Sequence, residues 1–307
     1  MKRGFDLIGA PFNQLGILPT KQNTVDGLRR LNETSWIGLS DWLDVRTTRW
    51  QADIIDHGDI NSDSKVQVLI DQGLKEQALA EYSRALHAKV LASYQAGRTP
   101  ITIGGDHSIA VGTVQATLDY FQKAQGKRVA IIWVDAHADC NDSLASNLHG
   151  KPLALLMDQY AHNGWQVEPE LVLNPTDVYY VGVRDLMLNE HELMNKHGMV
   201  NFDMNTVERI GIEGVLEQLV SIIDERYDAV YVSFDYDALD GTHFRACGTP
   251  NVGGLSAREA LHLVYGLAQH EKFVGIDFVE YLPELDSEEI SKELMIKLID
   301  AVWGFTM

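Results

Sequence analysis

Short apolar runs alternate with longer amphipathic stretches along the chain of 307 residues. Runs such as Val129–Val134 are apolar at every position, which is typical of strands buried on both faces of a sheet. The pattern predicts eight strands, at Phe5–Pro11, Asp53–Asp56, Pro100–Ile103, Val129–Val134, Val178–Val183, Val200–Phe202, Ala229–Phe234 and Phe273–Phe278. It predicts helices between them, at Gln67–Gln95, Ile212–Glu225, Ala257–Gln269 and Glu288–Trp303.

Strands that alternate with helices in this way favour a mainly parallel sheet with helices on both faces. We therefore expect an α/β fold with a central sheet of about eight strands. The chain contains no Pro/Ser-rich linker, no repeat and no low-complexity segment, so we expect a single domain over residues 1–307.

Ionisable side chains follow three of the predicted strands. Asp135, His137 and Asp139 come after Val129–Val134, while Asp235 and Asp237 come after Ala229–Phe234. Alternate residues of an extended chain face the same side, so each set converges on one spot. Crowded carboxylates repel one another unless a cation gathers them. The sequence therefore predicts a metal site at the carboxyl edge of the sheet, where ligands bind in folds of this kind.

A further histidine, His107, follows a third strand through the turn Gly104-Gly105-Asp106. Each motif alone is more often a turn or a helix cap than a ligand set, and the coincidence of three motifs indicates the site. The candidate metal ligands are His107, Asp135, His137, Asp139, Asp235 and Asp237. A carboxylate-rich set suits Mn²⁺ better than it suits a structural zinc site. Two ions would use all of these ligands and leave positions for water and substrate.

Composition narrows the possible partners and the expected cellular location of the protein. A net charge of −19 argues against nucleic acid or an anionic membrane as a partner, because both require a basic patch. Two cysteines do not suggest a disulfide framework, and no apolar run approaches the roughly 20 residues that span a bilayer. The first residues also lack the features of a signal peptide. We expect a soluble, cytoplasmic protein.

Three motifs together resemble the signatures of the arginase/agmatinase (ureohydrolase) family, and in detail they are most similar to arginases. They are Gly104-Gly105-Asp106-His107-Ser108, Asp135-Ala136-His137-Ala138-Asp139 and the segment from Ser233 to Asp240. The resemblance covers nearly the whole chain. It implies a three-layer α/β/α fold, two Mn²⁺ ions per chain and hydrolysis of a small guanidino substrate to urea and an amine, with L-arginine giving L-ornithine as the first choice. It also implies a homo-oligomer, either a trimer or a hexamer.

The same resemblance implies roles for further residues. Asp139 would hydrogen bond to the attacking hydroxide, and His149 would shuttle a proton near the leaving amine. Glu280 would grip the guanidinium, and Thr249 would lie near that glutamate. The implied substrate contacts are Asn141, Ser146, Glu190, Thr249 and Glu280.

The sequence also departs from the arginase pattern. Met187 stands where arginases carry an aspartate that reads the substrate α-amino group, Ala145 and Ser146 replace a serine and a glycine, and Arg245 puts a cation near the expected pocket rim. Agmatine, guanidinobutyrate and formimidoylglutamate therefore stay open as alternative substrates. Two hypotheses from other functional classes also stay open: a catalytically silent metal-binding homologue and a metal-dependent deacetylase relative. All ligand positions are filled, which argues against the first, and the paired-histidine motif of the second is absent.

Overall fold

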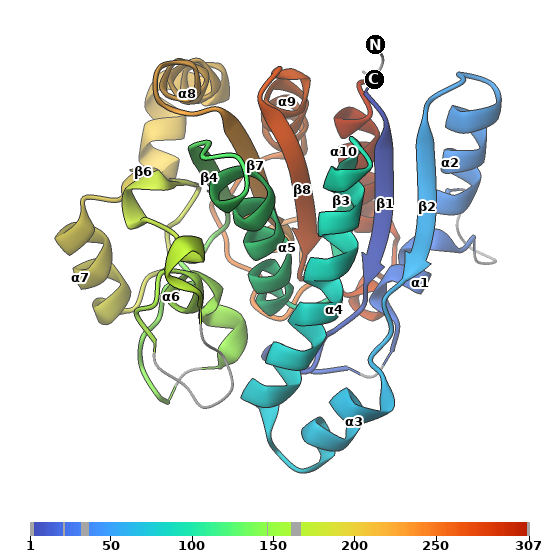
Figure 1. Cartoon of the computed structure of the whole chain (residues 1–307). Helices are drawn as coiled ribbons and strands as arrows, with labels where there is room; N and C mark the ends of the chain where they lie inside the picture. The colour runs from blue at the N-terminus through green and yellow to red at the C-terminus, as the bar shows by residue number, and fades with distance from the viewer. Residues whose placement is uncertain (1–2, 21, 32–36, 146, 161–166, 306–307) are drawn as a thin grey trace.

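A central sheet of eight parallel strands organises the chain (Figure 1). The structure is a computed structural model, which describes residues 3–20, 22–31, 37–145, 147–160 and 167–305. The strands are β1 (Phe5–Ala10), β2 (Ile54–Asp59), β3 (Thr99–Gly104), β4 (Val129–Val134), β5 (Val178–Val181), β6 (Val200–Phe202), β7 (Ala229–Asp235) and β8 (Phe273–Val279). Their order in the sheet is β2-β1-β3-β8-β7-β4-β5-β6, and neighbouring strands pair in parallel. The predicted α/β fold class and all eight strands are confirmed, with shifts of a few residues at their ends.

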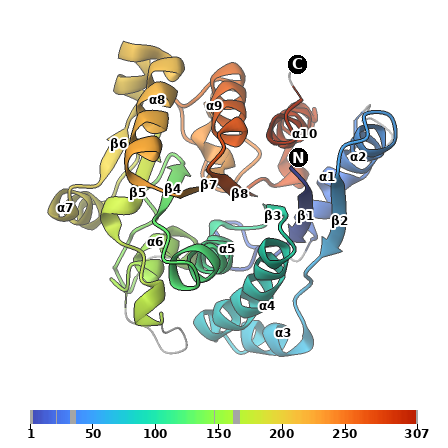
Figure 2. The ribbon, with the colours of Figure 1, turned by 45° about the horizontal axis from the view of Figure 1, so that its top comes forward.

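Helices cover both faces of the sheet, so the molecule has three layers (Figure 2). One face carries α1 (Thr24–Arg29), α2 (Leu39–Thr48), α8 (Met204–Arg226), α9 (Ala257–Gln269) and α10 (Ile290–Val302). The other carries α3 (Ser64–Asp71), α4 (Lys75–Gln95), α5 (Ala110–Thr117) and α6 (Pro152–Leu156). Helix α7 (Leu188–His197) lies beside the β6 edge of the sheet. No helix in the described ranges is long and apolar enough to cross a membrane.

Strand β4 shows why the central strands are apolar throughout. Ile131 and Trp133 belong to the core beneath α4, α5 and α6, while Ile132 and Val134 belong to the core beneath α8, α9 and α10. Every residue of β4 is buried. A strand between two helical layers gains hydrophobic stabilisation from both of its faces, so it has no polar face.

The order of the strands positions the site. Strands β7 and β8 lie between β3 and β4, so that β3, β8, β7 and β4 are consecutive neighbours at the centre of the sheet. All four run in the same direction, and their carboxyl ends therefore meet at one edge. The chain segments that follow these four strands are brought side by side there, although they are far apart in the sequence.

Glycines account for two differences from the predicted helices. The prediction of one helix over Gln67–Gln95 is wrong, because the segment forms α3 and α4 with a break at Gly73. Gly73 adopts a left-handed conformation with φ of 74°, which ends a helix and which glycine adopts without steric cost. Helix α8 begins at Met204, well before the predicted Ile212, and Gly211 interrupts it with φ of 72°.

Gly105 allows a close approach that places His107. A Cβ atom on Gly105 would overlap the carbonyl group of Phe12. The turn after β3 instead packs against the segment after β1, where the amide of Asp106 donates to the carbonyl oxygen of Phe12 at 2.9 Å. Only glycine permits this backbone contact.

We expect Gly105→Ala to lower the free energy of unfolding by about 3 kcal/mol, because neither backbone segment can move away without disturbing β1 or β3. Urea denaturation measures this loss. Gly126→Ala is the control, since a Cβ atom there meets nothing within 4 Å and only the positive φ of 66° opposes it. The control should lose about 1 kcal/mol. Equal losses for both variants would contradict the steric explanation.

Candidate metal centre and substrate pocket

The six predicted ligands lie together at the carboxyl edge of the central strands. His107 begins a 3₁₀ turn after β3, and Asp235 is the last residue of β7, with Asp237 in the 3₁₀ turn that follows. Ligand atoms of five of the six residues form two groups, each within 4.8 Å, and Asp235 adjoins the first group with Oδ2 2.9 Å from Nδ1 of His107. The first group is His107, Asp135 and Asp139, and the second is Asp135, His137 and Asp237. Asp135 belongs to both, so the arrangement is that of two adjacent cation sites sharing a carboxylate.

His107 is oriented as a metal ligand would be. Its Nε2 atom lies 2.9 Å from Oγ of Ser233, and Ser233 donates its hydroxyl proton to Asp277 at 2.5 Å. Since the hydroxyl proton goes to Asp277, the Ser233 oxygen accepts the proton of Nε2. In the neutral imidazole, Nδ1 is then the nitrogen that carries the lone pair. This buried Nδ1 atom makes no well-formed hydrogen bond among the described residues.

Three carboxylate oxygens nevertheless surround Nδ1 of His107. They belong to Asp135, Asp139 and Asp235, at 3.1, 2.9 and 2.9 Å. All three acids are buried. Burial and the charges of Asp237 and Asp135 raise the pKa of Asp235. Burial and the charge of Asp135 raise the pKa of Asp139 to about 6. An unprotonated ring nitrogen among clustered oxygens is a donor set that fits divalent cations.

Neighbouring side chains hold the carboxylates in place. Nε1 of Trp133 donates to Oδ2 of Asp135 at 2.9 Å, and the Trp133 ring stacks on His107 with 4.2 Å between centroids. The hydroxyl of Thr249 donates to Oδ2 of Asp237 at 2.7 Å. These contacts fix the directions in which the carboxylate oxygens point, so the cluster is preorganised.

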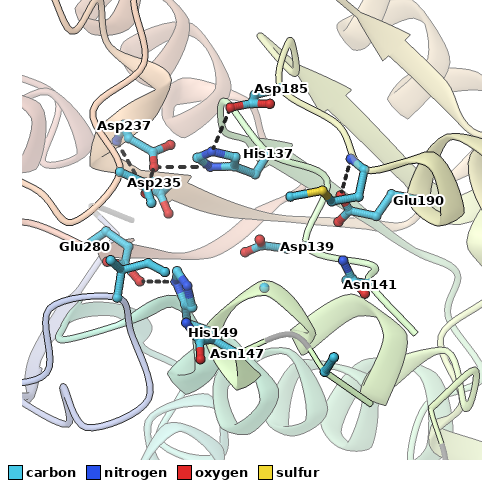
Figure 3. A pocket seen from close by; sticks show the side chains of 15 residues that line it. His137, Asp139, Asn141, Asn147, His149, Asp185, Glu190, Asp235, Asp237 and Glu280 are labelled. Carbon is cyan, nitrogen blue, oxygen red and sulfur yellow. Dashed lines mark hydrogen bonds and ion pairs between the residues drawn. The ribbon is translucent and has the colours of Figure 1, made fainter. Parts of the chain in front are cut away.

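A pocket of about 380 Å³ opens above this cluster (Figure 3). Its wall is made of Ile17, His137, Asp139, Asn141, Ala145, Asn147, His149, Gly150, Asp185, Met187, Glu190, Asp235, Asp237, Thr249 and Glu280. None of these described lining residues is lysine or arginine, whereas six are acidic. The electrostatic potential of the wall therefore favours a cationic ligand group.

His149 and Glu280 pair beside the cluster (Figure 3). Nδ1 of His149 lies 3.1 Å from Oε1 of Glu280, which also accepts the backbone N–H of His107 at 3.0 Å. Burial alone would lower the pKa of His149, but the hydrogen bond and charge of Glu280 raise that pKa to about 9. Glu280 itself has a left-handed backbone, with φ of 64°, and its amide donates to the carbonyl of Gly105 at 2.8 Å.

Asn141, Ala145, Met187 and Glu190 line the pocket as well, whereas Ser146 lies outside the described residues. Met187 is 63% exposed. Burial raises the pKa of Glu190 to about 7. Its Oε2 atom accepts the backbone N–H of Met187 at 3.0 Å.

Thr249 lines the pocket together with Glu280, and its hydroxyl donates to Oδ2 of Asp237 in the ligand cluster. One sequence expectation about the pocket needs correction. Arg245 is not among the described lining residues, and its guanidinium donates to the carbonyl oxygen of Gly241 at 2.9 Å.

Sequence reasoning missed several residues that support the site. Ser233 and Asp235 are alternate residues of β7, so the strand period could have indicated that Ser233 faces His107. Asp277 is followed by Glu280 in the same chain segment, but its contact with Ser233 depends on the pairing of β7 with β8. Asp185 lines the pocket, with its Oδ2 atom 3.9 Å from Nε2 of His137.

Comparisons with known proteins agree with this geometry. The family model described as "Arginase family" matches residues 4–304. The arginase of Coccidioides immitis is 34% identical over 247 residues, which cover 75% of this chain and 76% of that protein. The arginase of Eremothecium gossypii is 39% identical over 220 residues, but the match spans only about half, 53%, of its length. The solved structure of the arginase from Bacillus caldovelox superposes with a TM-score of 0.82 at 28% identity, covering 99% of each chain.

The fold and the site are those of a three-layer α/β protein with a carboxylate-rich centre beneath a pocket. The chain belongs to the arginase family.

We expect Ser233→Ala to weaken divalent-cation binding about tenfold, because Nε2 of His107 loses the partner that fixes the orientation and tautomer of the ring. Titration calorimetry measures the affinity. Ser83→Ala is the matched control, since Ser83 is equally buried but lies in α4 and does not line the pocket. An unchanged affinity in Ser233→Ala would show that the ring needs no such support.

Proposed function

We propose that this chain hydrolyses the guanidino group of a small molecule to urea and an amine, with L-arginine as the substrate and two Mn²⁺ ions as the cofactor. The observation that carries the proposal is the pair of ligand groups sharing Asp135 at the base of a pocket whose wall holds the His149–Glu280 pair. His107, Asp135, Asp139 and Asp235 would hold one ion. Asp135, His137, Asp235 and Asp237 would hold the other.

Glu280 is suited to bind the guanidinium. The described hydrogen bonds to its carboxylate fall on Oε1, so Oε2 is available to a planar cation in the pocket. A guanidinium bound there would have its carbon over the ligand cluster and would be oriented before reaction. Asn141, Ser146 and Glu190 would contact the other end of the substrate.

The proposed reaction needs an activated water and two proton transfers. When bound, the two cations would lower the pKa of a water molecule and supply a nucleophile at neutral pH. The Asp139 carboxylate would accept the hydroxyl proton of the adduct as the carbonyl group of urea forms, and would pass it to the leaving nitrogen. His149, protonated beside Glu280, would donate the second proton of the amine, and the proton released when the water first ionised would restore His149. Urea and a protonated amine would then leave.

Met187 favours a second candidate within the same reaction class. Its apolar side chain lines the pocket and offers no anionic partner to an α-ammonium group. A guanidino acid without that group, such as 4-guanidinobutyrate, would keep every other contact. Agmatine and formimidoylglutamate complete the set of substrates to be compared.

Protein reconstituted with Mn²⁺ should release urea from L-arginine when it is assayed beside agmatine, 4-guanidinobutyrate and guanidine, with ammonia release from formimidoylglutamate in parallel. Asp235→Ala should lose most of its bound metal and its turnover, because Asp235 faces both ligand groups. The exposed Asp41→Ala in α2 is the control and should keep both. Full metal occupancy without turnover of any substrate would identify a silent metal-binding homologue instead.

Glu280→Gln should lower the pKa of His149 from about 9, because burial remains while the imidazolium loses the hydrogen bond and charge of Glu280 and keeps only the charges of Asp139 and Asp106. NMR titration of the metal-free protein measures this shift. In the parent protein the pair stabilises the fold fully below the unfolded-state pKa, and the stabilisation is lost as the pH rises through about 9. A His149 pKa near 9 in the variant would exclude Glu280 as its cause.

A further inference from the structure

The carboxamide of Asn141 has a fixed orientation in the pocket wall. The backbone N–H of Ser143 donates to Oδ1 of Asn141 at 2.9 Å. A backbone N–H can only donate, so the oxygen of the amide must face Ser143. Nδ2 of Asn189 donates to the same oxygen at 2.9 Å. Both lone pairs of the oxygen are therefore used, and no atom of the described residues accepts a hydrogen bond from Nδ2 of Asn141.

Asn189 is itself fixed from two directions. Its Nδ2 atom lies 2.7 Å from Oδ1 of Asp142, and an ionised carboxylate only accepts, so the nitrogen and not the oxygen of Asn189 faces the loop. Asn189 lies in the first turn of α7. In this turn the Glu190 carboxylate accepts the backbone N–H of Met187, the N-cap residue of the helix. The start of α7 thus holds the side chains of two consecutive loop residues.

Lys151 binds the backbone of the same loop through its ammonium group. It is fully buried, with 0% of its surface exposed. Its ammonium donates to the carbonyl oxygen of Asn141 at 3.2 Å and to that of Ser143, and it lies 4.4 Å from the centre of the Tyr160 ring. A buried ammonium needs such acceptors, and the two loop carbonyls supply them.

The contacts of Asn189 and Lys151 with the loop of Asn141 determine which chemical group can bind at this end of the pocket. An amide N–H donor accepts nothing, so Nδ2 of Asn141 suits a carboxylate oxygen and is a poor partner for an ammonium. The described pocket lining has no lysine or arginine to bind a carboxylate in its place. In Figure 3 the nitrogen of Asn141 faces the middle of the pocket, on the side of Asp139.

We propose that Asn189 and Lys151 are positioning residues that present Nδ2 of Asn141 to the end of the pocket where, under the proposed function, the carboxylate of the substrate would bind. The inference rests on the proposed function and adds to it two residues that act through Asn141. Neither residue touches the substrate. Each acts through Asn141, so its loss affects recognition of the carboxylate and not the chemistry at the guanidinium.

The test uses Asn189→Asp and Lys151→Met in manganese-loaded protein. The Asp side chain has the shape of asparagine but cannot donate to Asn141, and methionine keeps the length of lysine without its charge. We expect KM for L-arginine and for 4-guanidinobutyrate to rise about tenfold, with kcat changed less than about threefold. KM for agmatine, which has no carboxylate, should stay within about twofold. Where agmatine is not turned over, its inhibition constant replaces its KM.

Two controls separate positioning from a structural role. Asn195→Asp introduces the same charge on the exposed side of α7 and should change none of these constants. Lys151→Arg retains donors for the two loop carbonyls and should recover part of the affinity that Lys151→Met loses. Equal KM changes for agmatine and for the two acids would overturn the positioning role. Turnover of agmatine but of neither acid would also overturn it, because no substrate carboxylate would then meet Asn141.

Binding can be measured independently of turnover. Calorimetry with L-ornithine and with putrescine, which lacks a carboxylate, applies the same comparison to manganese-loaded protein. Asn189→Asp should weaken L-ornithine about tenfold and leave putrescine unchanged. Such a result in a protein that releases no urea would retain the inference and reject the proposed reaction. Equal effects on both amines would reject the inference, whatever the turnover.

Discussion

Three buried carboxylates, those of Asp135, Asp139 and Asp235, lie in direct contact with the buried imidazole of His107 at the carboxyl ends of the central strands. Charges of like sign without solvent repel strongly, and each also loses its hydration. Ser233 and Asp277 engage Nε2 of His107 as a donor, so Nδ1 is the ring nitrogen that faces the acids. The cluster is therefore built for cations, and the tightly packed sheet around it opposes its dispersal.

Two functional residues show that the surrounding fold sustains local strain. Asp139 and Glu280 have left-handed backbones, with φ of 50° and 64°, although neither is glycine. Such conformations cost about 1 kcal/mol or more each. The Asp139 carbonyl accepts the amide of Leu153 at 2.9 Å, and the Glu280 amide donates to Gly105 at 2.8 Å. The partners of these hydrogen bonds lie in α6 and in the turn after β3. The packing of these elements therefore fixes the backbone of both residues and the direction in which their carboxylates point.

The period of two along a strand was enough to predict which side chains converge after β4 and β7, and apolar runs were enough to predict the strands. The order of the strands was not predictable from such local patterns. That His107 meets Asp235, and that Glu280 meets His149, depends on β7 and β8 lying between β3 and β4, which is a long-range pairing. Local periodicity also missed the break at Gly73, because the apolar pattern continues across it while the backbone does not.

The two ends of the pocket differ in how much a sequence motif can reveal. At the metal end, function depends on which residue types are present, so the motifs around His107, Asp135 and Asp235 carry most of the information. At the far end, the proposed function depends on the orientation of the Asn141 amide. The sequence shows only that the residue is an asparagine, and does not tell whether its nitrogen or its oxygen faces the substrate. That choice is made by Ser143, Asn189 and Lys151, whose contacts lie outside the ligand motifs. Under the proposed function, the orientation of this amide would select the substrate, because the acidic wall repels a carboxylate and its described residues supply no lysine or arginine to bind one.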